Sequence, residues 1–288
     1  MRQNMIRNAF ALMCTILLLT GVFFCHALAA PADTFTILLL GTDQMEKEVK
    51  DDSELGRSDA IVIATLHLKT GAVKMVSLNR DYLVEFPNGH GADRLCAATY
   101  LGGPQLTLQT INEVFHLDIP YFALVDFSGM QRMIDSLGGV EVEVLEDELD
   151  ILSADKITKA FEKAGKQSIG GSQAISYMRS RGADDDALRS VRQRKVLSAC
   201  LQKGLKLKMD DMIDLAGGML DYLKTNMSLN DIVSTAFSLV SIKISGMEDM
   251  RSPLQGTRNT VNLHSVVAAE DMQAEIDAVH AFLYGNAV

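Results

Sequence analysis

Six cationic side chains lie within one short segment of a chain that is acidic overall. The segment is YMRSRGADDDALRSVRQRKVL, residues 177–197, and its cations are Arg179, Arg181, Arg189, Arg192, Arg194 and Lys195. Guanidinium groups donate paired hydrogen bonds to phosphate and carboxylate oxygens, so such a cluster indicates an anion-binding site. The alternative is that Asp184, Asp185 and Asp186 neutralise these arginines in surface ion pairs, each worth about 0 to 1 kcal/mol.

Helical spacing argues that part of this segment is buried. If residues 188–205 form a helix, Arg189, Gln193, Val196 and Cys200 follow one another on one face. Val196 and Cys200 are typical of a buried face, so Arg189 and Gln193 would continue it. A buried arginine is costly unless a carboxylate or a bound anion accompanies it.

Two further stretches place charged side chains beside apolar strands. In GRSDA, Arg57 and Asp59 come just before one strand, and in SLNRD, Arg80 comes just after the next. The two strands would form a hairpin through Gly71. Antiparallel pairing brings the start of the first strand beside the end of the second, so we expect Asp59 and Arg80 to be neighbours.

A second carboxylate could lie at the same end of the sheet. Asp43 closes the apolar stretch TFTILLLGTD. Taken singly, Asp43 is typical of a turn and Asp59 of a strand start, but their convergence with Arg80 favours a site. Carboxylates can hold Mg²⁺, the cation bridges phosphate oxygens, and guanidinium groups neutralise the remaining negative charge.

The elements that would position these residues indicate a mixed α/β fold. The apolar strands DAIVIATLHL and AVKMVSLNR are hydrophobic on both faces, which is typical of a sheet covered on both sides. VEVEV, residues 140–144, alternates like a half-exposed strand. Helices are expected near 104–116, 127–137, 172–179, 188–206, 229–241 and 270–284. We predict one domain, residues 33–288, with a central mixed β-sheet and helices on both faces.

The N-terminal residues 1–32 look like an export element. Arg2 and Arg7 precede a stretch without Asp, Glu, Lys or Arg that includes LMCTILLLTGVFF. This is typical of a transmembrane anchor or a signal peptide, and ALAA, residues 27–30, is a possible cleavage site. We favour the anchor, and either interpretation places the remainder outside the cytoplasm.

Charge and cysteine content limit the classes of partner that the chain can bind and the roles that its cysteines can have. A net charge of -10 and an isoelectric point near 5.1 argue against general nucleic-acid binding. Cys96 and Cys200 could form a disulfide, but two cysteines so far apart are more often buried thiols. No Cys/His spacing indicates a zinc site.

Several of these stretches, in order, resemble one family of proteins. ILLLGTD, GRSDAIVIATL, SLNRD, ATYLGGP, VDFSGMQRMIDSLGGVEVEV, SIGGSQAISYMRSR and LRSVRQRKVL resemble the LytR-CpsA-Psr family of bacterial cell-envelope phosphotransferases. The resemblance implies transfer of a glycopolymer, as a sugar phosphate, from a polyprenyl-pyrophosphate carrier onto peptidoglycan outside the membrane. Alternatives are a hydrolase that cleaves the same pyrophosphate and a lipid-carrier-binding regulator without turnover.

The resemblance also implies roles for individual residues. Asp43 and Asp59 match the acidic pair that binds Mg²⁺, and with Arg80 they would be catalytic. Asp43 is favoured as the group that takes the proton of the acceptor hydroxyl. The residues expected to bind the pyrophosphate are Arg57, Arg80, Arg94, Arg179, Arg181, Arg189 and Gln193.

The chain departs from the family pattern at two places. Arg94, in DRLCAATY, stands where members often have lysine, and Ala187-Leu188 replaces a usual Phe-Gly. The first change keeps the charge but alters the donor geometry.

An isoprenoid tail would need an apolar groove, for which helices 104–116, 127–137 and 229–241 are candidate walls.

Overall fold

The structure is a computed structural model of the 288-residue chain. It describes residues 33–42, 55–154, 161, 163–180, 186–204, 206–207, 209–219, 222–228, 230–232, 234–235, 242–261 and 264–285. Its described helices are α2 (Ala97–Phe115), α3 (Phe127–Ser136), α4 (Glu146–Ala154), α5 (Gly171–Arg179), α6 (Asp186–Gly204), α7 (Met209–Met219) and α9 (Met272–Tyr284), with the short 3₁₀ helix η2 (Pro87–Gly89).

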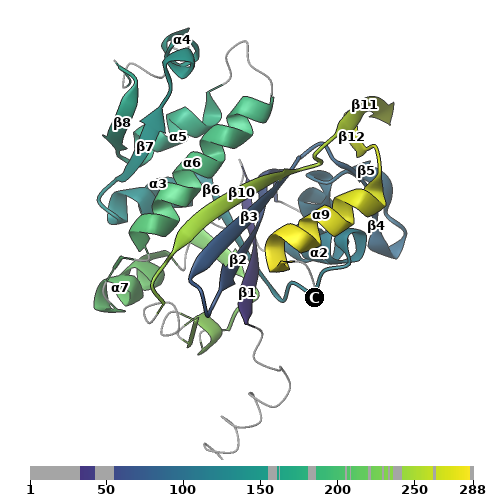
Figure 1. Ribbon diagram of the computed structural model, residues 1–288, viewed down its shortest axis with the longest axis horizontal. Coiled ribbons are helices and arrows are strands. Elements are labelled where there is room, and N and C mark those ends of the chain that lie inside the picture. The colour runs from purple at the N-terminus through teal and green to yellow at the C-terminus, as the bar shows by residue number, and fades with distance from the viewer. Residues whose placement is uncertain are drawn as a thin grey trace, which may run out of the picture.

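A six-stranded mixed sheet forms the centre of the molecule (Figure 1). Its strands, in spatial order, are β10 (Gly246–Ser252), β3 (Ala72–Leu78), β2 (Ser58–His67), β1 (Thr34–Thr42), β6 (Tyr121–Asp126) and β9 (Leu223–Thr225). β10 is parallel to β3, and β1 is parallel to β6, whereas the other neighbours are antiparallel. The predicted mixed sheet is confirmed.

The predicted hairpin between β2 and β3 is also confirmed. Val62 pairs with Ser77 and Leu66 with Val73, so the start of β2 lies beside the end of β3. Gly71 is required at the turn because its φ is 73° and a Cβ there would approach the carbonyl oxygen of Lys243 to 2.0 Å.

Helices cover both faces of the sheet, as the apolar pattern of the strands predicts. On one face, Ile61 and Ile63 of β2 pack in a core with Ile111 of α2 and Val279 of α9. On the other face, Val62 of the same strand packs in a cluster that includes α6. Figure 1 places α2 and α9 on one side of the sheet and α3, α6 and α7 on the other.

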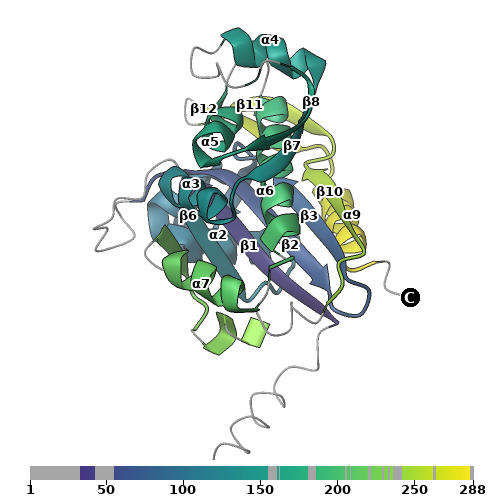
Figure 2. The same cartoon turned by 90° about the vertical axis from the view of Figure 1, so that its left-hand side faces the viewer.

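A further layer lies over α3, α5 and α6. It is the hairpin of β7 (Val140–Val144) and β8 (Gly165–Ile169), with α4 at its tip (Figure 2). The strictly alternating burial of β7 confirms the half-exposed strand predicted for VEVEV. Ile134, Val142 and Tyr177 are among the residues of its core.

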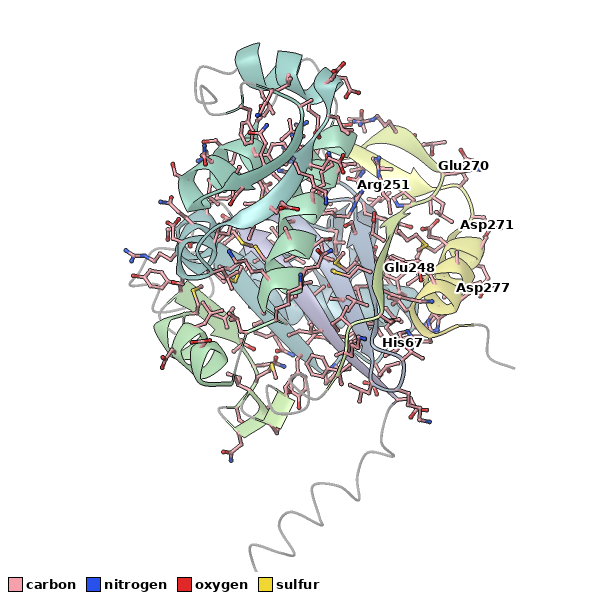
Figure 3. The ribbon with its side chains drawn as sticks, turned by 60° about the vertical axis from the view of Figure 1, so that its left-hand side comes forward. His67, Glu248, Arg251, Glu270, Asp271 and Asp277 are labelled. Carbon is pink, nitrogen blue, oxygen red and sulfur yellow. The ribbon has the colours of Figure 1, made fainter. Side chains whose placement is uncertain are left out.

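Several strands were not indicated by the sequence. The edge strand β10 leads into the hairpin of β11 (Gly256–Val261) and β12 (His264–Ala269), and then into α9, which confirms the helix predicted near 270–284. β4 (Leu83–Phe86) and β5 (Gly91–Arg94) form another two-stranded sheet. Figure 3 shows acidic side chains on this side of the molecule: Glu248 of β10, Asp277 of α9, and Asp271, which precedes α9.

Two expectations fall wholly or partly beyond the described residues. The predicted membrane anchor or signal, residues 1–32, lies outside them, and the helix predicted near 229–241 is described only in part. Among the helices that the structure does describe, none is both long and apolar enough to cross a membrane.

Candidate functional site

A register shift between β1 and β2 presents Asp59. Gly41 pairs with Ala60 and Thr42 pairs with Ser58, so Asp59 is an extra residue without a Cα partner in the described ladder. Such a bulge bends the strand and redirects its side chains, and bulges are frequent beside active sites. Asp59 consequently lines a cavity on the α6 face, whereas Ser58 bonds the Thr99 hydroxyl of α2 at 2.5 Å.

The Arg80 guanidinium contacts the carboxylate of Asp59, which is the neighbour relationship that the hairpin predicts. Both side chains are mostly buried, with exposures of 18% and 16%. Arg80 begins a turn in which the backbone N–H of Asp81 donates to the side chain of Asn79 at 2.9 Å. The backbone carbonyl of Arg80 also accepts a 2.9 Å hydrogen bond from the N–H of Cys96.

Arg94 extends this cluster from β5. The Asp81 carboxylate lies between two guanidinium groups, 3.6 Å from Arg80 Nε and 3.8 Å from Arg94 Nη1. Arg94 Nε is buried and has no hydrogen-bond partner among the described residues. A buried donor without an acceptor is unfavourable, so this geometry suits an anion with spare oxygen atoms.

Two other predicted arginines are exposed and rest on aromatic rings. The Arg57 guanidinium lies 5.9 Å from the centroid of Tyr100, and that of Arg179 lies 4.9 Å from the centroid of Phe127. Phe127 lines the same cavity as Asp59, so Arg179 belongs to the rim of that cavity. Arg181 and Asp43 lie outside the described residues, and their predicted roles stay predictions.

Two arginines of α6 are buried, whereas the side chains of Asp184, Asp185 and Asp186, which the surface-pair alternative assigns to them, are not among the described ones. Arg189 is 4% exposed and Arg192 is fully buried, while Gln193 lines the cavity. Arg192 Nη2 donates to the carbonyl oxygen of Ser180 at 2.7 Å, directly after Arg179. A cation there satisfies a carbonyl at the C-terminal end of α5.

The remaining cations of this segment have structural partners. Arg194 Nε lies 3.1 Å from a carboxylate oxygen of Asp249 on β10, and burial lowers the pKa of this guanidinium. Lys195 Nζ lies 2.9 Å from Glu148, which also accepts from the hydroxyl of Tyr177. Sequence reasoning missed Arg192 and Glu148 as supports of the site, because only the fold shows that their partners are buried.

An apolar cavity of about 360 Å³ opens beside Asp59. It lies between the sheet and the helices α3, α6 and α7. Its apolar lining comes mainly from Leu39, Val62, Phe127, Met130, Met133, Leu137, Leu197, Leu201, Leu215 and Met219.

The candidate walls of an isoprenoid groove can be compared with this lining. Residues 127–137 do line it, because α3 supplies Phe127, Met130 and Met133, and Leu137 follows the helix. Residues 104–116 do not line this cavity, because α2 packs on the opposite face of the sheet. No described residue of 229–241 lines the cavity.

Both cysteines of the described domain are buried free thiols, in agreement with the interpretation we favoured. Burial raises the pKa of Cys96, an effect partly offset by Arg80 and Arg94 nearby. Cys200 lines the apolar cavity, and burial raises the pKa of its thiol to about 12.

The described oxygen donors fit a magnesium ion only as part of its coordination shell. Among the described residues, no group of three or more His, Cys, Asp or Glu side chains could hold a metal. A Mg²⁺ ion on a phosphate substrate takes one or two protein carboxylates, with phosphate and water as its other ligands. Asp59 is a carboxylate at the cavity that could serve as one such ligand, and the second candidate, Asp43, is not described.

Comparison with known proteins gives consistent matches. A model of the LytR_cpsA_psr family matches residues 24–279. The polyisoprenyl-teichoic acid–peptidoglycan teichoic acid transferase TagT of Bacillus subtilis strain 168 is 35% identical over 216 residues, which is 73% of this chain and 66% of the relative, just under two thirds of its length.

Solved structures resemble the fold over most of the chain. A structure described as TagT bound to LIIa-WTA has a TM-score of 0.72 and 30% identity, covering 88% of this chain and 90% of that one. A second, described as a family protein with bound octaprenyl pyrophosphate lipid, has a TM-score of 0.67 and 27% identity, covering 88% and 91%.

Proposed function

The chain belongs to the LytR_cpsA_psr family, and we propose that it transfers a glycopolymer, as a sugar phosphate, from a polyprenyl-pyrophosphate carrier onto peptidoglycan outside the cell membrane. The observation that carries this proposal is the contact of Arg80 with Asp59 beside an apolar cavity. A charged cluster joined to an apolar cavity suits a substrate with a charged head and a hydrocarbon tail.

The cavity would hold part of the polyprenyl chain. Most of its lining residues are Leu, Val, Met or Phe, and such surfaces favour a hydrocarbon because binding removes apolar area from water. Polar groups are confined to a few residues, including Thr42, Asp59, Asp126 and Gln193. The relative described with octaprenyl pyrophosphate supports this assignment, because it shares the fold.

The pyrophosphate would lie where this polar end meets the arginines. Arg80 and Arg94 are held in place by Asp81, and Arg179 lies on the ring of Phe127. Charged hydrogen bonds contribute on the order of 1.5 to 3 kcal/mol each, so several of them can dominate head-group binding. Arg57, Arg181, Arg189 and Gln193 are proposed to complete the set.

The proposed reaction is a phosphoryl transfer between two oxygen atoms. The hydroxyl oxygen of the peptidoglycan acceptor forms a bond to the phosphorus nearest the sugar. The bond from that phosphorus to the bridging oxygen breaks, and polyprenyl phosphate leaves with the electron pair. Fixed arginines stabilise the negative charge that develops on the leaving phosphate.

We propose Asp59 and Asp43 as ligands of a magnesium ion, and Asp43 as the base that takes the acceptor proton. When bound, this cation would supply positive charge for the phosphate oxygens. Asp59 would keep its contact with Arg80 through one oxygen and offer the other to the cation. Residues 1–32 are proposed to hold the domain at the outer face of the membrane.

Transfer can be separated from its alternatives with one substrate mixture. The full chain in detergent micelles is incubated with a lipid-pyrophosphate oligosaccharide, labelled in the sugar, and with peptidoglycan strands. We expect the label in the insoluble peptidoglycan. Label in free sugar phosphate would indicate a hydrolase, and label that stays on the lipid would indicate a binding protein without turnover.

A further inference from the structure

Tyr100 is an exposed aromatic residue close to the site, with no part in the chemistry described above. It is 53% exposed, and its neighbour Leu101 is 41% exposed. Both are among the few large hydrophobic side chains that the described part leaves open to solvent. An exposed apolar pair beside a site indicates a contact with a ligand or a partner.

The backbone at Tyr100 is anchored beside the residues proposed to bind the head group. Its neighbour Thr99 is fully buried and joins a chain of hydroxyls, bonding Ser58 at 2.5 Å and Thr107 at 2.8 Å. Ser58 directly precedes Asp59, so the ring is tied to the segment that presents the site. The backbone that carries the ring is therefore held in place, which lowers part of the entropic cost of using the ring for binding.

A cation already lies over the ring. The Arg57 guanidinium lies 5.9 Å from its centroid, and the exposure of the side chain leaves room for a second flat group. The electron-rich face of an aromatic ring attracts the weakly positive C–H bonds on one side of a pyranose. Arg57 could donate to the hydroxyls at the edge of the same sugar.

We propose that Tyr100, whose ring Arg57 overlies, is a stacking platform for a sugar ring at the transfer site. This inference rests on the proposed function and adds a carbohydrate subsite to it. The sugar could be the one attached to the pyrophosphate of the donor or one belonging to the acceptor strand, and the ring chemistry is the same for both.

The position of Tyr100, on α2 beside one end of the central sheet, favours a sugar over a lipid surface. Ser58 pairs with Thr42, the last residue of β1, so Tyr100 lies at that end of the strand. The segment proposed as the membrane anchor precedes Thr34, at the other end. Nine residues at about 3.3 Å each separate the two ends by roughly 25 to 30 Å.

Tyr284 offers a matched control. It is an exposed tyrosine, 39% accessible, and its hydroxyl interacts with Thr36 near the start of β1. Tyr284→Ala thus removes an aromatic ring from the end of the sheet remote from Tyr100. It lies outside the proposed machinery, so transfer by this variant should equal that of the unmodified chain.

The test compares full chains carrying Tyr100→Ala, Tyr100→Phe, Tyr100→Leu or Tyr284→Ala. Binding is measured to polyprenyl pyrophosphate and to the same lipid carrying the sugar, and KM is measured for peptidoglycan strands. If the sugar belongs to the donor, loss of the ring should weaken binding of the sugar-bearing lipid about tenfold and leave binding of the sugar-free lipid unchanged. If the sugar belongs to the acceptor, loss of the ring should instead raise the KM for peptidoglycan strands about tenfold. Tyr100→Phe should behave like the unmodified chain because it keeps an aromatic ring, whereas Tyr100→Leu should show the same loss as Tyr100→Ala.

Other results would overturn the inference. Equal weakening of sugar-free and sugar-bearing lipid would mean that the ring supports the pyrophosphate. Loss of binding to phosphatidylglycerol vesicles, with both sugar responses unchanged, would assign Tyr100 to the membrane surface. An unmodified chain that binds the sugar-bearing lipid more tightly than the bare lipid but transfers nothing would refute the proposed function alone.

Discussion

Arg80 and Asp59 are 21 residues apart in the chain, yet the guanidinium of one contacts the carboxylate of the other. The relationship comes from two features. The β2–β3 hairpin brings the ends of the strands together, and the bulge at the β1–β2 register shift presents Asp59 to the cavity. A carboxylate and a guanidinium are thereby placed beside the cavity proposed for the lipid.

Replacing Arg80 by Ala should reduce transfer by at least about 10²- to 10³-fold, because a fixed donor to the developing charge is lost. The melting temperature should change by no more than about 4 °C, since the side chain lies at the edge of the core. Lys69→Ala is the control, because it removes a cation from an exposed pair with Asp33. Normal transfer by Arg80→Ala would contradict the assignment.

Replacing Asp59 by Asn should abolish both transfer and its response to added Mg²⁺, because an amide is a weaker ligand than a carboxylate. Asp81→Asn is the matched comparison, since Asp81 contacts Arg80 and Arg94 and is not a proposed ligand. That variant should lose activity but keep its magnesium response. An unchanged magnesium titration in Asp59→Asn would exclude Asp59 as a ligand.

Replacing Gly204 by Phe should weaken binding of polyprenyl pyrophosphate about tenfold. Gly204 lines the cavity, and a Cβ there meets no atom within 4 Å, so the ring can be accommodated without disrupting the fold. Gly217→Phe is the control, because Gly217 is an exposed residue of α7 with equal space around it. Calorimetric titration with long and short prenyl pyrophosphates measures the affinity of each variant. Equal affinities of Gly204→Phe and Gly217→Phe would place the lipid elsewhere.

Alkaline pH should destabilise the protein partly through Cys200. Its folded pKa is about 12, above the unfolded value near 8.5, so its contribution is complete below the unfolded pKa. Between these values the unfolded state loses a proton that the folded state keeps, and stability falls by up to about 1.4 kcal/mol per pH unit. The free energy of unfolding, measured with urea from pH 8 to 10.5, should fall less steeply with pH in Cys200→Ala than in the unmodified chain. Identical slopes for the two proteins would refute this cause.

Sequence periodicity was sufficient for the central elements. The strands around Gly71, the half-exposed strand at 140–144 and the helix carrying Arg189 all have apolar residues at the spacing that their burial requires. The hairpin alone made Asp59 and Arg80 neighbours, because antiparallel pairing fixes which ends meet.

Other parts could not be predicted because they depend on contacts between distant segments. The register shift at Asp59 depends on how β1 and β2 pair, which no local pattern determines. β10 is an exposed edge strand without clear alternation, and β11 is almost wholly exposed, so hydrophobic period gives no signal for either. The burial of Arg192 depends on the end of α5, which meets α6 only in the fold.

The phosphorus atom that moves tests the central claim most directly. A donor is prepared with ³²P only in the phosphate attached to the sugar, and the full chain transfers it to peptidoglycan strands. We predict that the label enters peptidoglycan with the unmodified chain and not with Arg80→Ala, while the released polyprenyl phosphate is unlabelled. Label on the released lipid, or equal transfer by Arg80→Ala, would contradict cleavage between the two phosphates at this site.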